Sequence, residues 1–425
     1  MSVSLPETLD PRKRSHSADA PATFYTIAGS NDVFWRCKAP AAAIGANVCL
    51  IGEDDAEKVF TEPHTGKPLP WTLTMTLVDG TQKRILTMAG WEKVRSKKTP
   101  YRWTSLEAEF PDHEGVAIFS RPAFAQSVLA KSMREQNLIR TIAESDDNYF
   151  APAGNVMLRE RMKKDSDLLE HAKAFAQQDA CIFSTNWLRD RYLREFRERF
   201  GRKGLPELHV CRNHIPAENW PERVPGDGRV RVGFMGSASH VWDVSIAYAA
   251  FQTAKFHKAK TVMVGWSPSD PEPGLPDRIE TEEGEVIFQR TDASRERIAE
   301  WQKVVDEHIP WVRSDEYHRA GLPLDIGLCP LNYNDFNMGK SDVKAIEYTI
   351  SGAAVVCSNI PVYNEFWKHE ETCLMANSWI EFAQAVERLI RDPKLRFELV
   401  SAAQEKVASE RGLPQMQEEW KAAIG

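Results

Sequence analysis

The residues with the clearest capacity for chemistry lie between Lys340 and Glu347. Lys340 and Lys344 are spaced to share one helix face, and Ser341 and Asp342 are good N-cap candidates for that helix. Two cations at a helix N-terminus are unfavourable unless an anion binds, because this end of the helix dipole is positive. Together with the free N–H groups of the helix, the two lysines predict a diphosphate site. Glu347 is placed to accept hydrogen bonds from sugar hydroxyls. The alternative is a solvated lysine pair and a surface glutamate.

A second set of small and polar residues follows the apolar segment 229–235. Gly236, Ser237 and Ser239 offer backbone N–H groups and hydroxyl donors directly after a strand, an arrangement that commonly binds phosphate. His240 comes next and is a candidate catalytic residue, because its ring can donate to a phosphate oxygen or to the sugar. The alternative is a tight turn in which Ser239 caps the next helix.

Two adjacent carboxylates mark the end of a strand in the first half of the chain. Asp146 and Asp147 follow the apolar segment 137–143 and are candidates to orient an acceptor hydroxyl or to act as its general base. The alternative is a capped loop. The pair does not form an Asp-x-Asp metal motif.

Other polar residues lie at strand–helix junctions of the first half. Gly29 and Arg36 follow the strand at 23–27 and are assigned to the donor phosphates. Arg121 follows the strand at 115–120 and is assigned to the acceptor. The carboxyl ends of parallel strands meet at one edge of a sheet, so these residues are expected at a common cleft. Surface arginines are the alternative.

A basic segment with interleaved aromatic residues lies between positions 83 and 103. Its cations are opposed only by Glu92, and nucleic-acid phosphates and bases are the groups that such a mixture binds. The predicted acceptor-binding residues here are Lys93, Arg95, Lys97, Lys98 and Arg102, with Trp91, Tyr101 and Trp103 beside them. A solvated hairpin with core aromatics is the alternative.

The elements that must position these residues alternate between strands and helices. In the first half, apolar runs predict strands at 23–27, 47–51, 115–120, 137–143 and 180–184, with helices such as 123–134 and 187–200 between them. After a linker at 213–228, a second set predicts strands at 229–235, 261–264, 285–289, 325–328, 353–357 and 373–375, then helices at 380–391, 393–411 and 414–423. This alternation predicts an α/β fold with two Rossmann-like, doubly wound parallel sheets.

One segment interrupts the alternation. Residues 71–77 and 82–88 alternate like strands, with the turn-forming pair Asp79-Gly80 between them. They predict an antiparallel β insertion, spanning residues 53–110, within the first domain. The expected organisation is a tail at 1–22, a first domain at 23–222, a second domain at 223–411 and a final helix at 412–425.

Composition narrows the class of protein. The chain has 425 residues and a formal net charge of −7, which argues against wholesale wrapping of nucleic acid. Its seven cysteines include no Cys-x-x-Cys pair and suit a reducing compartment. No apolar run approaches the roughly 18 residues of a membrane helix, and the N-terminus lacks a hydrophobic signal core, so we expect a cytosolic protein.

The segment 340–356 also resembles a family signature. It is similar to the donor-site motif of group 1 (family 4-like) glycosyltransferases of bacteria and tailed phages, carried here by Lys340, Ser341, Lys344, Glu347, Tyr348, Gly352, Val355 and Val356. Residues 231–244, RVGFMGSASHVWDV, are similar to the opening of the same family's C-terminal domain. The resemblance covers the last half of the chain well and the first half weakly.

The resemblance implies a two-domain GT-B enzyme that uses a nucleotide-sugar co-substrate and needs no metal or other cofactor. It also implies that the helix at 412–425 crosses back to the first domain. Many retaining members carry a second glutamate eight positions before the one matched by Glu347. Here that position is Gly339, with Asn337 and Asp335 as nearby substitutes, so retention of configuration is expected by resemblance alone.

The expected function is transfer of a hexose from a UDP-sugar to a hydroxyl acceptor. The basic segment favours a hydroxymethylated pyrimidine in phage-type DNA as the acceptor, and a glycan, a lipid-linked glycan or a protein stays an alternative. Two other functions stay open. One is a non-catalytic GT-B protein that binds a nucleotide-sugar or nucleic acid, and the other is a sugar-nucleotide epimerase.

Overall fold

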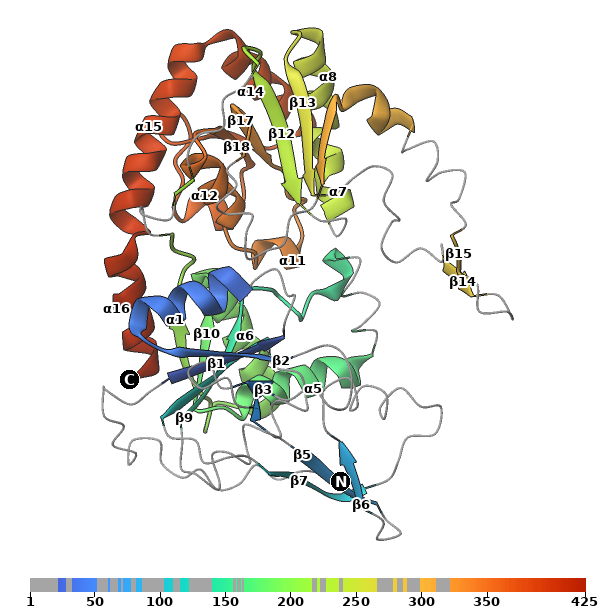
Figure 1. The fold of residues 1–425 in the computed structure, drawn as a ribbon, viewed down its shortest axis with the longest axis vertical. Helices are drawn as coiled ribbons and strands as arrows, with labels where there is room; N and C mark the ends of the chain where they lie inside the picture. Colours follow the sequence, from blue (N-terminus) through green and yellow to red (C-terminus); the bar gives the residue numbers. More distant parts are fainter. Residues whose placement is uncertain are drawn as a thin grey trace. The chain divides into compact units, whose positions relative to one another are not determined.

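The computed structural model contains two compact units, each built on its own parallel sheet (Figure 1). Unit 1 comprises residues 1–146, 164–214 and 413–425, and unit 2 comprises residues 147–163 and 215–412. The residues that the structure describes are 22–27, 33–51, 60–61, 68–69, 72–77, 82–85, 103–109, 115–121, 140–155, 158, 162, 164–215, 220–221, 227–236, 240–265, 278–280, 286–288, 299–310 and 322–425.

Unit 1 contains a six-stranded sheet in the order β11-β10-β9-β8-β1-β2, in which neighbouring strands run parallel. Its strands are β1 (Ala22–Ile27), β2 (Asn47–Ile51), β8 (Val116–Ser120), β9 (Arg140–Ser145), β10 (Ala180–Phe183) and β11 (Glu207–Val210). The strand predicted at 137–143 extends to Ser145, because β9 continues through buried polar residues that an apolar run does not include.

Helices cover both faces of this sheet. They are η2, a π-helix (Val33–Lys38), α1 (Ala39–Ile44), α5 (Asp165–Ala176), α6 (Asn186–Phe200) and α16 (Leu413–Ile424). Along β10, Ile182 belongs to the core shared with α1 and α16, whereas the Phe183 ring lies 4.6 Å from that of Tyr192 on α6. Successive side chains of a strand point to opposite faces, so the helices form a layer on each side.

Local signals explain α6. The Thr185 hydroxyl accepts from the Leu188 N–H at 3.2 Å and caps the helix, and Gly201 ends it. Leu188, Tyr192 and Phe196 repeat at four-residue spacing and are fully buried, so one apolar stripe faces the sheet.

The last helix, α16, packs within unit 1. Trp420 is fully buried, and its ring centroid lies 5.2 Å from that of Phe24 on β1. Glu419 on the same helix accepts from the Arg212 backbone N–H at 2.7 Å and contacts His214 Nε2 at 2.9 Å. The chain terminus is therefore anchored by apolar burial and by one carboxylate.

Between β2 and β8 the structure describes short antiparallel strands. β5 (Thr72–Leu77) pairs with β6 (Gln82–Ile85) on one side and with β7 (Trp103–Glu109) on the other. β3 (Phe60–Thr61) pairs with β4 (Pro68–Leu69).

Unit 2 contains the second six-stranded sheet, in the order β16-β13-β12-β17-β18-β19, again with parallel neighbours. Its strands are β12 (Arg231–Gly236), β13 (Lys260–Gly265), β16 (Glu307–Pro310), β17 (Ile326–Cys329), β18 (Ala354–Ser358) and β19 (Leu374–Ala376). Its helices are η3 (Pro152–Gly154), α7 (Val241–Val244), η6 (Ser245–Ala247), α8 (Tyr248–Phe256), α11 (Asp335–Met338), α12 (Val343–Ile350), α13 (Pro361–Asn364), α14 (Trp379–Arg391) and α15 (Pro393–Glu410).

The two faces of this sheet can be told apart along β17. Ile326 and Leu328 lie in the core with α8 and α14, whereas Gly327 between them faces Tyr348 of α12. α8 and α12 therefore lie on opposite sides of the sheet (Figure 1). Both units have the predicted doubly wound α/β architecture.

One predicted strand of the second half belongs elsewhere. The segment 285–289 contains β15 (Val286–Phe288), which pairs antiparallel with β14 (Arg278–Glu280) instead of joining the parallel sheet. β16 occupies the sheet edge beside β13. Its side chains alternate between half-buried and exposed, so it lacks the continuous apolar run that marks the inner strands.

Candidate donor site

The candidate site is built on α12 and on the end of β12. α12 begins beyond the C-terminal end of β17, the edge at which open α/β sheets bind ligands. The structure corrects the predicted cap. Asp342 stands at the N-cap position, but its Oδ2 accepts from Trp367 Nε1 at 3.1 Å and from Arg411 Nη2 at 3.2 Å, and it makes no capping hydrogen bond. The first N–H groups of α12 therefore have no side-chain cap.

Tyr348 fixes the position of α12 against the sheet. Its hydroxyl accepts from the Met235 N–H at 2.7 Å and donates to the Leu328 carbonyl at 3.3 Å. Its ring lies directly over Gly327, where an added Cβ would overlap ring atoms. Tyr348 thus ties the ends of β12 and β17 together. The motif tyrosine and the strand glycine form a matched pair that places Glu347, only 4% exposed, beside this edge.

A chain of three polar side chains connects β12 to α12. Asp243 Oδ2 lies 3.1 Å from His240 Nδ1, and His240 Nε2 lies 2.7 Å from Lys344 Nζ. Lys344 Nζ also lies 5.6 Å from the centre of the Phe234 ring. The structure therefore brings together two predicted residues, His240 and Lys344, that are 104 positions apart in the sequence.

The ionisation of this chain follows from its surroundings. Burial, and then the charge of Lys344, lower the pKa of His240 to about 3, although the hydrogen bond with Asp243 raises it. Burial, and then the charge of Lys340, lower the pKa of Lys344 to about 8. Burial raises the pKa of Asp243, but the hydrogen bond and charge of His240, the Asn332 N–H and the charge of Lys340 together outweigh burial and leave the pKa below its usual value. At neutral pH the chain is carboxylate, neutral imidazole and ammonium.

Asp243 is the residue of this site that sequence reasoning missed. Its Oδ1 accepts from the Asn332 N–H at 2.9 Å and from Asn337 Nδ2 at 2.8 Å. It thereby joins the loop after β12 to the loop after β17. The signal was present in the HVWD sequence, where Asp243 stands three positions after His240, but the pattern alone does not show its partners.

Lys340 lies beside α11. Its Nζ is 3.4 Å from Asp147 Oδ1 and 4.6 Å from the centre of the Phe336 ring. Asn148, next in sequence to Asp147, donates to the Asp335 carbonyl at 2.8 Å. The predicted residues Lys340 and Asp147 are thus in contact within unit 2. Ser341 lies between Lys340 and the N-cap position and is half-buried.

Two predicted cations of unit 1 bind carboxylates of β9 and its end. Arg36 is fully buried, and its Nε lies 2.5 Å from Glu144 Oε1. Its Nη1 donates to the Cys211 carbonyl at 2.6 Å. Arg121 lies 2.5 Å from Asp146, so the predicted acceptor residue and the predicted base form an ion pair. The donor contact of Arg36 stays a prediction, and in the described residues its guanidinium ties strands together.

Of the remaining predicted site residues, the structure describes one, Gly236, and the others lie outside the described ranges. Gly236 ends β12, where an added Cβ would lie 2.9 Å from two Phe234 ring atoms and 3.3 Å from His240 Cδ2. Residues outside the described ranges are Gly29, Ser237, Ser239, Lys93, Arg95, Lys97, Lys98 and Arg102.

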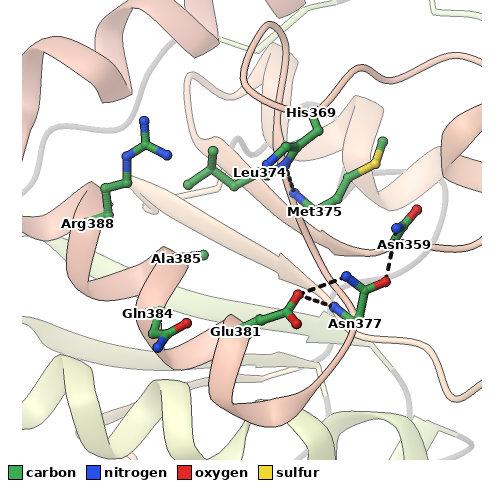
Figure 2. A pocket seen from close by; sticks show the side chains of 9 residues that line it. All are labelled: Asn359, His369, Leu374, Met375, Asn377, Glu381, Gln384, Ala385 and Arg388. Carbon is green, nitrogen blue, oxygen red and sulfur yellow. Dashed lines mark hydrogen bonds between the residues drawn. The ribbon is translucent and has the colours of Figure 1, made fainter.

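A pocket of about 450 Å³ lies along β19 and α14 and contains none of the predicted residues. Figure 2 shows that its polar side chains bind one another: Asn359 donates to Asn377 at 2.9 Å, and Asn377 donates to Glu381 at 2.9 Å. His369 accepts from the Met375 N–H at 2.9 Å. Its arginine, Arg388, is paired with Glu370, and the asparagines and Glu381 bind one another, so this pocket is not the candidate diphosphate site.

Metal-binding clusters and membrane-spanning helices are absent from the part of the chain that the structure describes. There, no group of three or more His, Cys, Asp or Glu side chains is placed to hold a metal ion. None of the helices described is long and apolar enough to cross a membrane.

Comparisons with known proteins agree with this geometry. Residues 283–416 match the family model described as glycosyl transferase-like. A search of curated proteins finds no match. Among solved structures, HepE from Anabaena, in complex with UDP and glucose, is similar with 9% identity, a TM-score of 0.55, and coverage of 95% of this chain and 99% of that chain.

Two other structures show the same likeness. Sucrose-phosphate synthase from Thermosynechococcus elongatus has 13% identity and a TM-score of 0.55, with 94% of this chain and 98% of that chain covered. A glycosyltransferase from Rickettsia africae has 10% identity and a TM-score of 0.55, with 95% and 98% covered. The predicted resemblance is confirmed at the level of fold and family match: the chain has the GT-B fold of these structures, and its residues 283–416 match a glycosyl transferase-like family model.

Proposed function

We propose that the protein transfers a sugar, a hexose, from a UDP-sugar to a hydroxyl acceptor. The observation that carries the proposal is the cluster at the start of α12. Uncapped N–H groups, the Lys344 ammonium and the half-buried Lys340 surround the strand edge, and Glu347 follows on the same helix. In support, the structurally similar HepE is described in complex with UDP and with UDP-glucose.

Sugar transfer from a UDP-sugar requires stabilisation of the leaving diphosphate. As the glycosidic bond breaks, negative charge develops on the phosphate oxygens, and preorganised N–H dipoles and cations lower the free energy of that state. Lys340 and Lys344 supply the cations, and α12 supplies the dipole. Glu347 accepts from the ribose hydroxyls of the donor. Asp146, bound to Arg121, is the proposed base for the acceptor hydroxyl.

Two finer parts of the proposal concern stereochemistry and setting. We infer retention of configuration, with buried Asn337 in place of the glutamate that Gly339 replaces. We also infer a cytosolic enzyme of bacterial or phage origin that requires no divalent metal. Each of these parts stays a prediction.

The acceptor is the least constrained part. A hydroxymethylated pyrimidine in duplex DNA is proposed from the composition of the basic segment at 83–103. Neutralising Lys93, Arg95, Lys97 and Lys98 together should weaken DNA binding and flatten its salt dependence. An unchanged rate of transfer in that variant would favour the alternative glycan, lipid-linked or protein acceptor.

The donor assignment is tested by ligand-induced thermal stabilisation. UDP-glucose should raise the melting temperature more than GDP-mannose does, and Glu347→Ala should weaken UDP-glucose binding by about 1–3 kcal/mol through loss of hydrogen bonds. Glu347→Gln keeps the side-chain volume and serves as the folded control. Unchanged UDP-glucose affinity in both folded variants would remove the assignment and favour a non-catalytic GT-B protein.

A further inference from the structure

When Lys344 is charged, its contact with His240 has only one consistent proton arrangement. Lys344 as an ammonium has N–H donors and no acceptor, so His240 Nε2, at 2.7 Å, must accept. A neutral imidazole then carries its proton on Nδ1, which faces the Asp243 carboxylate at 3.1 Å. The carboxylate therefore selects the Nδ1–H tautomer of His240, and that tautomer gives Lys344 an acceptor.

Asp243 is held firmly enough to make this selection. It is 6% exposed, and its other oxygen accepts from the Asn332 N–H and from Asn337 Nδ2. Both of those partners are donors, so the carboxylate stays ionised and cannot turn away without leaving buried donors unpaired. The Phe234 ring and Gly236 pack against the His240 imidazole and restrict its position. The space at position 236 is so small that a Cβ there would contact both the Phe234 ring and the His240 ring.

The arrangement holds Lys344 without neutralising it. A carboxylate partner would form an ion pair that a diphosphate must first break, whereas a neutral imidazole offers one hydrogen bond and no charge. The ammonium keeps its attraction for an anion and is prevented from extending into solvent. When a diphosphate binds, Lys344 exchanges its neutral acceptor, His240 Nε2, for a charged phosphate oxygen.

We propose that Asp243 is a positioning residue for donor binding: through the Nδ1–H tautomer of His240 it holds Lys344 in place, and Lys344 passes from His240 Nε2 to the donor's diphosphate when the donor binds. The inference rests on the proposed function, since it names the diphosphate as the incoming anion. No covalent bond changes in this step. One N–H···N hydrogen bond is exchanged for N–H···O contacts.

The arrangement has a measurable consequence for protons. The charged groups that face Lys344 are Lys340 before α12, Asp243 on α7 and Glu347 on α12, while Cys329 on β17 and His240 complete its titratable neighbours. With a pKa of about 8, Lys344 is neutral in about half of the unliganded molecules at pH 8. A diphosphate favours the charged form, so donor binding at pH 8 should take up about half a proton from the buffer.

Two measurements test the proposal. The first is the tautomer of His240 in the unliganded protein, read from two-bond ¹H–¹⁵N correlations of ¹⁵N-histidine at pH 7 and assigned with His240→Gln. We expect the Nδ1–H tautomer in the wild type and its loss in Asp243→Asn. An Nε2–H tautomer or an imidazolium ion at His240 in the wild type would overturn the proposal.

The second measurement is calorimetric titration with UDP-glucose at pH 8 in buffers of different ionisation enthalpy. We expect proton uptake in the wild type, none in Lys344→Arg, and an affinity at least tenfold lower in Asp243→Asn, the loss of about one charge-assisted hydrogen bond. Asp306→Asn is the matched control. Asp306 also accepts from a backbone N–H and a lysine, but at the start of β13, the opposite end of the sheet from the candidate site.

The outcomes separate this inference from the proposed function. If Asp243→Asn binds UDP-glucose as tightly as Asp306→Asn does, the positioning role is wrong and the donor assignment stands. If the wild type binds UDP-glucose without proton uptake while Asp243→Asn still binds at least tenfold more weakly, the positioning role stands and Lys344 is fully charged before binding. If neither UDP-glucose nor UDP binds to the folded wild type, the proposed function is wrong, and the role of Asp243 in donor binding is wrong with it.

Discussion

Both units place cations at the carboxyl ends of their strands, but the partners of those cations differ. In unit 1, Arg36 and Arg121 each lie 2.5 Å from a carboxylate, Glu144 and Asp146. In unit 2, Lys344 lies 2.7 Å from the neutral imidazole of His240. The ion pairs of unit 1 satisfy their charges inside the fold. Lys344 keeps a charge that an incoming anion can neutralise, whereas Lys340, also in unit 2, lies 3.4 Å from Asp147 Oδ1 and is intermediate between the two cases. We therefore expect the partner of a cation, more than its place on the sheet, to decide how readily it binds a ligand.

The largest expected effect comes from breaking the buried pair of unit 1. Arg36→Met leaves the Glu144 carboxylate buried without the arginine's charge, which should lower the free energy of unfolding by about 3–5 kcal/mol. Urea denaturation measures this directly. The double variant Arg36→Met/Glu144→Met removes both charges and should recover part of the loss. A single variant that is stable but binds UDP-glucose poorly would break the comparison, because Arg36 would then serve the donor phosphates.

A slightly smaller effect is expected from the carboxylate that anchors α16 in unit 1. Burial raises the pKa of Glu419, but its contacts with His214 and Arg212 dominate and hold the pKa at about 2. Because this lies below the unfolded-state value, the carboxylate stabilises the fold above about pH 4.5 by roughly 3 kcal/mol, and this is lost as the pH falls toward 2. Glu419→Gln should remove that part of the acid dependence, as measured by urea denaturation between pH 3 and pH 7. An identical pH profile in the variant would show that α16 is held by Trp420 packing alone.

The next effect concerns ligand affinity in unit 2. Lys344→Met should weaken UDP-glucose binding by about 1.5–3 kcal/mol, the range for a hydrogen bond to a charged group, with little change in unfolding free energy. The change in stability is small because the imidazole partner carries no charge that would be left unpaired. Lys255→Met is the matched control, since Lys255 pairs with Asp306 at 2.7 Å and is 37% exposed. Equal affinity loss in both variants would show a general electrostatic effect and erase the contrast between the units.

The sheets and α12 could be predicted because their signals are local. Apolar runs mark the inner strands, and the spacing of Val343, Ile346 and Ile350 marks α12. The predicted helix face shared by Lys340 and Lys344 is wrong, because α12 begins at Val343 and Lys340 lies before it. The edge strand β16 was missed because its alternating, half-exposed residues resemble a loop. A strand that is buried on both faces is an apolar run and can be predicted, whereas a half-exposed edge strand such as β16 cannot.

The partners of the polar residues could not be predicted, because they depend on distant segments. Arg36 was assigned to phosphates, yet its carboxylate partner lies 108 positions away, and no local pattern indicates that pairing. Asp243 appears in the sequence as one acidic residue of a short helix, whereas its role depends on Asn332 and Asn337, about ninety positions later. The type of a residue shows that it can bind a phosphate. Only the folded structure shows whether that residue already binds another side chain.

The smallest expected effect tests whether the cations of unit 2 are sufficient by themselves. Release of UDP from UDP-glucose should proceed at the same rate after dialysis against EDTA as in added Mg²⁺. The reason is that Lys340, Lys344 and the N–H groups of α12 already oppose the charge that develops on the diphosphate, and these donors need no reorganisation when the bond breaks. Lys344→Met should make the reaction slower in both conditions. If the wild-type rate falls strongly in EDTA and returns with Mg²⁺, a bound metal, and not Lys344, stabilises the charge of the leaving group. The contrast between the carboxylate-paired cations of unit 1 and Lys344 of unit 2 would then not explain the function.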